Sequence, residues 1–372
     1  MKVGIDTFGC NHGRSGLGSY LSSLTANFQN TDEITYELFG AEIDRYIFGS
    51  EQNLTYKALS SVEGLFPLRF WHKCFANSFA HRQSYDAVLY AAGAHYLPSS
   101  FRVPGVAVVN DVVSNLLAEN KAKVLSVSIQ RSLKKADRVI VPSQFIRKDL
   151  EKLGVKNEKI VVIHNGINHS LFYPQELLSP SLVDIKPFAI QRPYFIYASR
   201  LNASSKKHVE LIKAFTLFKD KTHLPHRLVL AGSDGPYSDE VHKAAFASHA
   251  ASDIFITGFF PHENFPALYS GSDGCLFPAV GEGVGLPVLE AMATGVPVAC
   301  AKSGALPEIA GNNALYFDAD NIEDIALAME TLALDKAERE RLIAGGIAWT
   351  KRFSWEKTAE MTTAVLREVA AR

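Results

Sequence analysis

Short hydrophobic runs of strand length alternate along the chain with amphipathic segments of helical length. In the first half, β-branched and apolar runs bounded by turn residues predict strands at Lys2–Asp6, Ala87–Tyr90, Val106–Val109, Arg138–Val141 and Ile160–Ile163. Between these runs, Leu17–Phe28 and Val124–Ala136 have the apolar period of a helix. Strands that alternate with helices are typical of a parallel sheet covered on both faces.

The same alternation restarts after a proline-containing stretch of weak periodicity from Tyr173 to Pro193. Further strands are expected at Tyr194–Ala198, Arg227–Ala231, Ile254–Thr257, Gly274–Phe277, Val296–Cys300 and Ala314–Phe317, and further helices at Asn321–Leu334 and Trp355–Ala371. The pattern therefore predicts an α/β protein of two Rossmann-like, doubly wound domains with a cleft between them. We expect the domains at residues 1–172 and 192–350, joined by a linker at 173–191.

Composition agrees with two ordinary globular domains. The 372 residues exceed what one hydrophobic core usually supports, and 47% of them are hydrophobic and 21% charged. Residues 1–175 hold 19 Lys and Arg against 15 Asp and Glu, which is too mild an excess for a nucleic-acid-binding domain. We therefore expect no nucleic-acid partner.

The spacing of the cysteines and the hydropathy of the chain predict the cellular compartment of the protein. The four cysteines are far apart and lack CxxC spacing, which argues against a zinc site or a disulfide framework and suits a reducing compartment. The chain opens on a strand-like run, and no stretch reaches about 18 uninterrupted apolar residues. The expectation is a cytoplasmic protein without a signal peptide or membrane span.

A glycine-rich loop leads into a short helix at PAVGEGVGLPVLEAMATGVP, residues 278–297. Gly283 and Gly285 precede Pro287, which suits a first helical turn. Free N–H groups at such a helix start attract phosphate, and glycine lets a ligand come close. Glu282 and Glu290 lie on this segment, so that one carboxylate can face a sugar and the other a ribose hydroxyl pair.

This segment, together with several others in order, resembles the family 4 retaining glycosyltransferases. The matching motifs span nearly the whole chain: RSGLGSYLSSL, ADRVIVPSQFIRKDL, KIVVIHNGINHSLFYP, SRLNASSKKHVELIKAF, TGFFPHENFPALYSGSDGCLFP, GEGVGLPVLEAMATGVPV and SGALPEIAGNNALYFDADNIEDIALAM. The resemblance implies the GT-B fold, with an acceptor-side N-terminal domain and a nucleotide-sugar-binding C-terminal domain. It also implies that a C-terminal helix, 351–372, returns to the N-terminal domain.

The resemblance assigns roles to charged residues of the second domain. Arg200 and Lys206 would bind the donor diphosphate and stabilise the charge that builds as it leaves. This chain has one residue more between them than the family usually shows, so Lys207 is an alternative to Lys206. Glu290 would bind the ribose and Glu282 the donor sugar.

Backbone groups and the N-terminal domain complete the implied site. The loop residues Gly283, Val284, Gly285 and Leu286 would contact phosphate and sugar, Phe259 would lie beside the base, and Gly16 and Gly18 would approach the diphosphate. Asp111 would orient an acceptor hydroxyl or the sugar. Asn110 stands where relatives have histidine, and Ala279 and Val284 stand where they have serine and phenylalanine, which leaves the donor sugar open.

The implied activity is metal-independent transfer of a hexosyl group, with retention, from a GDP-, UDP- or ADP-sugar to a glycan or lipid-linked acceptor in polysaccharide or glycoconjugate synthesis. Mannosyl transfer is slightly favoured, and no cofactor or metal is expected. Two alternatives stay open: a nucleotide-sugar epimerase of the same fold and a non-catalytic nucleotide-sugar-binding subunit. A glycosidase is disfavoured, since eight helical steps from Glu282 to Glu290 would rise about 12 Å, whereas the two catalytic carboxyls of a glycosidase lie about 5 to 9.5 Å apart.

Two other segments can be interpreted either as functional sites or as ordinary structural elements. The stretch from Leu65 to Phe79 mixes aromatic and basic residues, which suits peripheral contact with the inner face of a membrane but also a core helix. Asp318 and Asp320 have the spacing of a metal-binding pair, yet they precede a helix and are better explained as a turn with a cap.

Overall fold

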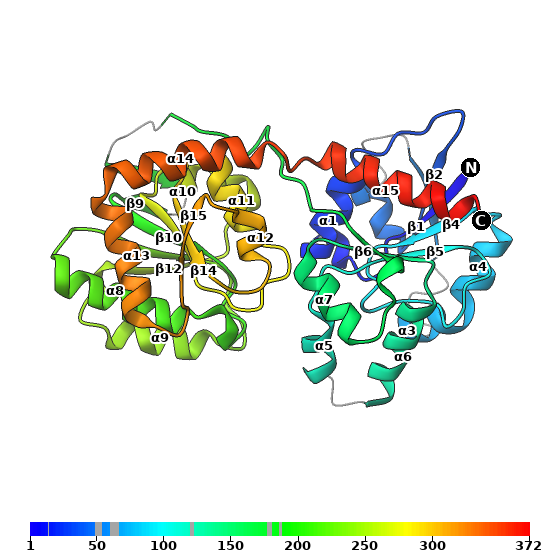
Figure 1. The fold of residues 1–372 in the computed structure, drawn as a ribbon, viewed down its shortest axis with the longest axis horizontal. Helices are drawn as coiled ribbons and strands as arrows, with labels where there is room; N and C mark the ends of the chain where they lie inside the picture. The colour runs from blue at the N-terminus through cyan, green and yellow to red at the C-terminus, as the bar shows by residue number, and fades with distance from the viewer. Residues whose placement is uncertain (14, 49–53, 60–66, 120–122, 177–180, 186–187) are drawn as a thin grey trace. The chain divides into compact units, whose positions relative to one another are not determined.

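The computed structural model describes residues 1–13, 15–48, 54–59, 67–119, 123–176, 181–185 and 188–372. The chain forms two compact units (Figure 1). Unit 1 comprises Met1–Gly166 together with Phe353–Arg372, and unit 2 comprises Ile167–Arg352. Each unit contains a parallel sheet with helices around it, so the predicted fold class of two doubly wound α/β domains is confirmed.

Unit 1 contains, within the described residues, a seven-stranded sheet whose pairings are all parallel. The order across the sheet is β3 (Thr55–Ala58), β2 (Thr35–Gly40), β1 (Lys2–Asp6), β4 (Ala87–Tyr90), β5 (Gly105–Val108), β6 (Arg138–Val141) and β7 (Ile160–Val162). Every residue of β4 and β5 is buried, because both faces of the sheet are covered. This is why these strands have continuous hydrophobic sequences.

Helices cover both faces of this sheet. They are α1 (Gly16–Thr25), α2 (Arg45–Phe48), α3 (Leu68–Trp71), α4 (Asn77–Arg82), α5 (Val113–Glu119), α6 (Lys123–Lys135), α7 (Gln144–Lys152) and α15 (Trp355–Ala370), with short turns η1 (Asn11–Gly13), η2 (Glu42–Asp44), η3 (His72–Ala76) and η4 (Asn157–Lys159). Alternate residues of β4 belong to different hydrophobic clusters. Val88 and Tyr90 are part of one cluster, and Ala87 and Leu89 are part of the other. Successive side chains of a strand point to opposite faces, so each face has its own core.

The last helix, α15, packs in unit 1, although the long segment from Ile167 to Arg352 that precedes it belongs to unit 2. In Figure 1 it lies beside α1, from the other end of the chain. Trp355 and Leu366 are buried in the same cluster as Val3 and Ile5, and Thr358 Oγ1 donates a hydrogen bond to the His164 carbonyl at 2.9 Å. The C-terminal helix therefore completes one of the two cores of unit 1.

Unit 2 contains, among the described residues, a six-stranded parallel sheet and a two-stranded antiparallel hairpin. The sheet order is β12 (Ile254–Gly258), β11 (Arg227–Ala231), β10 (Tyr194–Ala198), β13 (Gly274–Phe277), β14 (Val298–Ala301) and β15 (Ala314–Phe317), and the hairpin is β8 (Leu182–Ile185) with β9 (Phe188–Gln191). Its helices are α8 (His208–Thr222), α9 (Ser238–Ala247), α10 (Phe265–Ser270), α11 (Leu286–Ala293), α12 (Leu306–Ala310), α13 (Ile322–Leu334) and α14 (Lys336–Thr350), with short turns η5 (Ser204–Lys206), η6 (Ala251–Asp253) and η7 (His262–Asn264).

The boundary between the units falls at Gly166 and Ile167, six residues before the expected end of the first domain at 172. Phe172 explains the difference, because it is buried against His262 and Tyr269 of unit 2. Part of the stretch expected as a linker, 173–191, forms the hairpin of β8 and β9.

Of the aromatic stretch from Leu65 to Phe79, the structure describes residues 67–79, and Leu65 and Phe66 lie outside the described residues. Trp71 and Phe79 are buried in the core of unit 1, whereas Phe70 and Phe75 are 45% and 43% exposed. The membrane-facing interpretation therefore fails for Trp71 and Phe79. In the part of the chain that the structure describes, every helix is too short or too polar to cross a bilayer.

Gly166 tests the docking of α15. A Cβ atom at this position would overlap the backbone of Ser354 and Trp355 at the start of the helix. We expect Gly166→Ala to destabilise unit 1 by about 1–3 kcal/mol, because backbone cannot give way as a side chain can. Urea unfolding followed by tryptophan fluorescence measures this. Gly16→Ala is the matched control, since a Cβ there meets nothing within 4 Å, and equal stability of the two variants would contradict the docking.

Candidate functional site

The expected site residues of unit 2 follow two neighbouring strands at the centre of its sheet. Strand β10 has β11 on one side and β13 on the other, so the chain changes direction across the sheet at this point. In doubly wound sheets such a switch point opens a crevice beyond the carboxyl ends of the strands. Arg200 and Lys206 follow β10, and Glu282 and Gly285 follow β13. Both loops therefore reach the same edge.

An ion pair joins these two loops. Lys206 Nζ lies 2.8 Å from Glu282 Oε2, and both side chains are about three-quarters buried, with 25% and 21% of their surface exposed. The backbone adds a second link, because the Val280 N–H donates to the Ser205 carbonyl at 2.8 Å. A cation and a carboxylate are thus held together at the switch point, where one suits phosphate and the other sugar hydroxyls.

The glycine-rich loop is held in place by its own backbone. Gly285 precedes α11 with φ +72°, a conformation that favours glycine. The Ala305 N–H donates to the Glu282 carbonyl at 2.8 Å, and a Cβ at Gly304 would lie 2.5 Å from that same oxygen. Glu282 is therefore positioned by close backbone packing, with Gly283 and Val284 leading from it to the helix start at Leu286.

The two adjacent lysines point to different partners. Lys207 takes the left-handed conformation with φ +56° and forms ion pairs with Glu210 at 3.2 Å and with Asp320. Lys206 instead reaches Glu282. Of the two candidates that the sequence left open, the structure brings Lys206 to the glycine loop.

Asp320 is part of a helix-capping turn. Its N–H donates to Asp318 Oδ1 at 3.0 Å, and Asn321 caps the start of α13. The pair Asp318 and Asp320 thus has the turn geometry that the sequence favoured over a metal site.

Glu290 lies on α11 with 12% of its side chain exposed, and its carboxylate bonds His262 Nε2 at 3.0 Å. This hydrogen bond raises the pKa of His262 above its ordinary value. The ring of His262 also stands edge-on to Phe172, with ring centroids 5.1 Å apart. Sequence reasoning missed His262, although the residue lies in the motif TGFFPHENF just after β12. Glu282 and Glu290 thus bond different partners, Lys206 and His262.

Among the expected site residues of unit 2, Arg200 and Phe259 are exposed. Arg200 lies in the loop after β10, and Phe259 follows β12 with 73% of its surface exposed. Burial lowers the pKa of His208, the first residue of α8, to about 4, so this imidazole is neutral near pH 7. Arg200 and Lys206 therefore carry positive charge at this edge of the sheet, whereas His208 does not.

In unit 1 the two N-terminal glycines differ. Gly16 is exposed at the start of α1, and space around it is open. Gly18 is buried, its N–H donates to the capping hydroxyl of Ser15 at 3.1 Å, and a Cβ there would overlap Cys10 and Gly13. Gly18 lets the loop and helix pack closely, whereas Gly16 leaves the surface free for a ligand.

Asp111 follows β5 and bonds a histidine that the sequence did not single out. His95, from the loop after β4, places Nε2 3.2 Å from Asp111 Oδ2. The carboxylate is 39% exposed and the imidazole 29%. Asn110 replaces the family histidine, and its Oδ1 is buried without a hydrogen-bond partner. The imidazole beside Asp111 is therefore that of His95, which follows the neighbouring strand β4.

Comparison with known proteins agrees with this geometry. The family model for glycosyl transferases group 1 matches residues 183–349, and that for glycosyltransferase family 4 matches residues 49–171. The O-antigen chain mannosyltransferase B of Escherichia coli is 27% identical over 66% of this chain and 64% of its own length. The sulfoquinovosyl transferase SQD2 of Arabidopsis thaliana is 28% identical over 59% of this chain and 42% of its own. The chain thus spans less than two thirds of these relatives.

Solved structures share the fold across the whole chain. Anabaena HepE in complex with UDP has a TM-score of 0.74 at 19% identity and covers 99% of both chains. Sucrose-phosphate synthase from Thermosynechococcus elongatus has a TM-score of 0.75 at 18% identity and covers 100% of this chain and 99% of its own. The chain belongs to the family 4 glycosyltransferases and has their GT-B fold.

Proposed function

We propose that the protein is a retaining hexosyltransferase that works without a metal ion and takes a mannosyl group from a nucleotide-activated donor. The observation that carries this proposal is the Lys206–Glu282 ion pair at the switch point of unit 2, with Arg200 on the same loop as Lys206. Support for mannose comes from the mannosyltransferases among the relatives, including the serotype-specific mannosyltransferase WbdA of Escherichia coli, 31% identical over 42% of this chain and 20% of its own.

The donor is assigned to unit 2. Anabaena HepE is known in complex with UDP and with UDP-glucose, which supports a nucleotide-sugar as ligand of this fold. Arg200 and Lys206 would bind the diphosphate, Glu282 the sugar hydroxyls, Glu290 the ribose, and Phe259 the base. GDP, UDP and ADP all carry the diphosphate and ribose that these groups recognise.

Charge stabilisation supplies the chemistry. As the bond between the anomeric carbon and the diphosphate oxygen breaks, negative charge grows on the diphosphate. Arg200 and Lys206 are fixed cations that stabilise this charge, the role that a metal ion has in other transferases. The leaving diphosphate oxygen takes the proton of the acceptor hydroxyl, which attacks on the same face of the sugar, and the configuration is retained.

The acceptor is assigned to unit 1. Asp111 and His95 form a polar pair at the carboxyl ends of β5 and β4, where a sugar hydroxyl finds both a donor and an acceptor. We infer that the acceptor is a glycan or a lipid-linked sugar, since O-antigen and serotype-specific transferases are among the relatives.

Donor turnover tests the proposed reaction. With UDP-, GDP- and ADP-sugars in the presence of a chelator, we expect one donor to release its nucleoside diphosphate. Glu290→Gln should lower kcat/KM at least about tenfold, because it removes a charged hydrogen bond to the ribose. Glu323→Gln, an exposed acid of the same unit, is the control. Conversion of one nucleotide-sugar into another would instead indicate an epimerase, and binding of a donor with no turnover of any would indicate a non-catalytic subunit.

The stereochemistry is read from the product. Proton NMR of the newly formed glycosidic linkage should show the donor's anomeric configuration. An inverted product would refute retention while leaving the assignment of the donor to unit 2 in place.

His262 predicts a pH dependence of nucleotide binding. The bond to Glu290 raises the pKa of His262. The pair therefore stabilises the folded protein most below about pH 6.5, and this stabilisation is lost as the pH rises through the raised pKa. Since ribose would compete for Glu290, nucleoside diphosphate should bind more tightly as pH rises through that range. Calorimetry of wild type and His262→Ala tests this, because the nucleotide's own titration is common to both.

The variant should have a flatter pH profile than the wild type. His249→Ala, an exposed histidine of the same unit, should keep the wild-type profile. Parallel profiles of wild type and His262→Ala would show that binding leaves the His262–Glu290 pair intact.

A further inference from the structure

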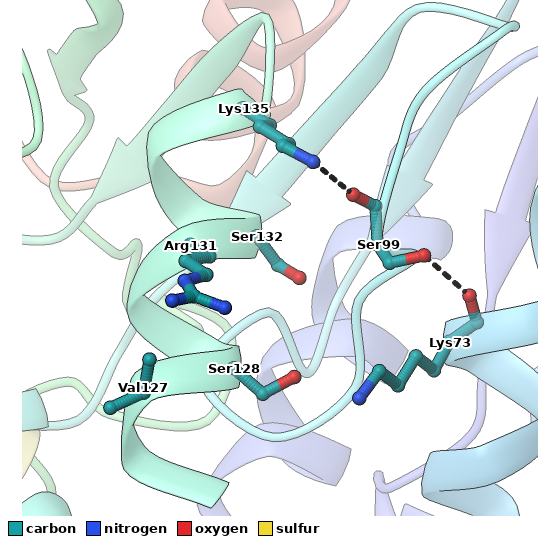
Figure 2. A pocket seen from close by; sticks show the side chains of 7 residues that line it. All are labelled: Lys73, Ser99, Val127, Ser128, Arg131, Ser132 and Lys135. Carbon is teal, nitrogen blue, oxygen red and sulfur yellow. Dashed lines mark hydrogen bonds between the residues drawn. The ribbon is translucent and has the colours of Figure 1, made fainter. Parts of the chain in front are cut away.

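Unit 1 contains a basic hollow that the proposed chemistry leaves unexplained. It has a volume of about 440 Å³ and lies between α6 and the segments that carry Lys73 and Ser99 (Figure 2). No acidic side chain is among the described residues that line it. Its polar lining consists of three cations and three hydroxyls, Lys73, Arg131, Lys135, Ser99, Ser128 and Ser132.

Hydrogen bonds build the frame of this hollow. Lys135 Nζ donates to the Ser99 carbonyl at 2.9 Å, and Ser99 Oγ donates to the Lys73 carbonyl at 2.8 Å. These two bonds tie α6 to η3 through the Ser99 loop. Figure 2 shows Lys73, Ser128 and Ser132 extending into the space between them.

The chemistry of the lining matches a phosphate group. Like charges gathered in a concave surface raise the local potential and attract an anion. Lysine and arginine are donors only, and the hydroxyls of Ser128 and Ser132 can also donate, so the lining complements a group whose oxygens all accept. A phosphate or diphosphate would neutralise the cluster.

A second hollow leads from this cluster toward the expected reaction edge. It has a volume of about 340 Å³ and shares Lys73, Ser128 and Ser132 with the first. Its lining continues to Gly93 and His95, and His95 is the partner of Asp111. A sugar attached to a phosphate in the basic hollow would therefore extend toward the Asp111–His95 pair.

Apolar side chains also line the second hollow, beside the polar side chains of Arg69, Lys73 and His95. Phe70, Leu97 and Ile129 line it, and the exposed rings of Phe70 and Phe75 contact each other edge to face with centroids 5.9 Å apart. Exposed aromatic rings beside a cationic hollow suit a ligand with both an apolar chain and a phosphate. An acceptor of that kind has its sugar joined to a lipid through phosphate.

We propose that the basic hollow is the acceptor's phosphate subsite: Lys73, Arg131 and Lys135 bind the phosphate or diphosphate that joins the acceptor sugar to a lipid, and Phe70 contacts the first part of the lipid chain. This assignment rests on the proposed function, because it specifies the acceptor of that reaction. Free pyrophosphate offers the same charged group, so a test must separate it from a lipid diphosphate.

Calorimetry of the full chain with three probes makes this separation. Geranyl diphosphate has both parts of the ligand, inorganic pyrophosphate lacks the chain, and geraniol lacks the charge. We expect geranyl diphosphate to bind more tightly than pyrophosphate, and geraniol to give no detectable binding. Lys73→Gln/Arg131→Gln should raise the Kd for geranyl diphosphate about tenfold to a hundredfold, since two charged donors are lost. Phe70→Ser should weaken the binding of geranyl diphosphate but leave the binding of pyrophosphate unchanged.

Two controls keep this outcome distinct from that of the donor site. Lys148→Gln/Lys152→Gln removes the same charge from exposed positions of α7 and should bind geranyl diphosphate as the wild type does. Nucleoside diphosphate should bind the Lys73→Gln/Arg131→Gln variant with unchanged Kd, which shows that unit 2 is folded. An unchanged midpoint of urea unfolding by tryptophan fluorescence, to which Trp71 and Trp355 contribute, shows that unit 1 is folded. This binding test holds even if no donor is turned over.

Three results would overturn the proposal. The first is equal binding of geranyl diphosphate by wild type and Lys73→Gln/Arg131→Gln, which would place the ligand elsewhere. The second is pyrophosphate binding as tightly as geranyl diphosphate, which would indicate a free phosphate ligand. The third is partitioning onto phosphatidylglycerol vesicles that depends on Lys73 and Arg131 without any geranyl diphosphate binding, which would make the hollow a membrane contact.

Discussion

Parallel pairing of the strands is the constraint on which the rest of the structure depends. When all strands of a sheet run the same way, their carboxyl ends meet at one edge, and the loops that follow them become neighbours even when they are far apart in sequence. Lys206 and Glu282 are 76 residues apart, yet they form an ion pair because β10 and β13 are adjacent. The same rule brings His95 to Asp111 through β4 and β5.

The two units have different arrangements of charged side chains. In unit 2 the internal pairs Lys206–Glu282 and His262–Glu290 satisfy the carboxylates, while Arg200 stays exposed. A ligand that carries both hydroxyls and phosphate can exchange with these partners without leaving a buried charge unpaired. In unit 1 the cations of the hollow lack such carboxylates among the described lining residues. The first arrangement suits a sugar nucleotide, and the second suits a simpler anion.

Most of the sheet could be predicted from the sequence, because buried parallel strands are continuous hydrophobic runs; Tyr194–Ala198 was predicted with its observed bounds. Strand β2 was not identified, since Glu37 interrupts its hydrophobic side chains; that carboxylate accepts a hydrogen bond from the Tyr85 hydroxyl in the fold. The choice between Lys206 and Lys207 also could not be made, because it depends on the left-handed backbone of Lys207. His95 and His262 could not be singled out from the sequence, because only the tertiary fold brings them to their partners, Asp111 and Glu290.

The return of α15 to unit 1 has a consequence for how the protein forms during synthesis. Val3 and Ile5 emerge from the ribosome before unit 2, but the core that buries them includes Leu366 and Val369. Unit 2 lies entirely within the intervening chain, from Ile167 to Arg352, and so can fold while unit 1 still lacks one wall. Domains usually fold in the order in which they are made, whereas here the first unit to be started is the last to be finished.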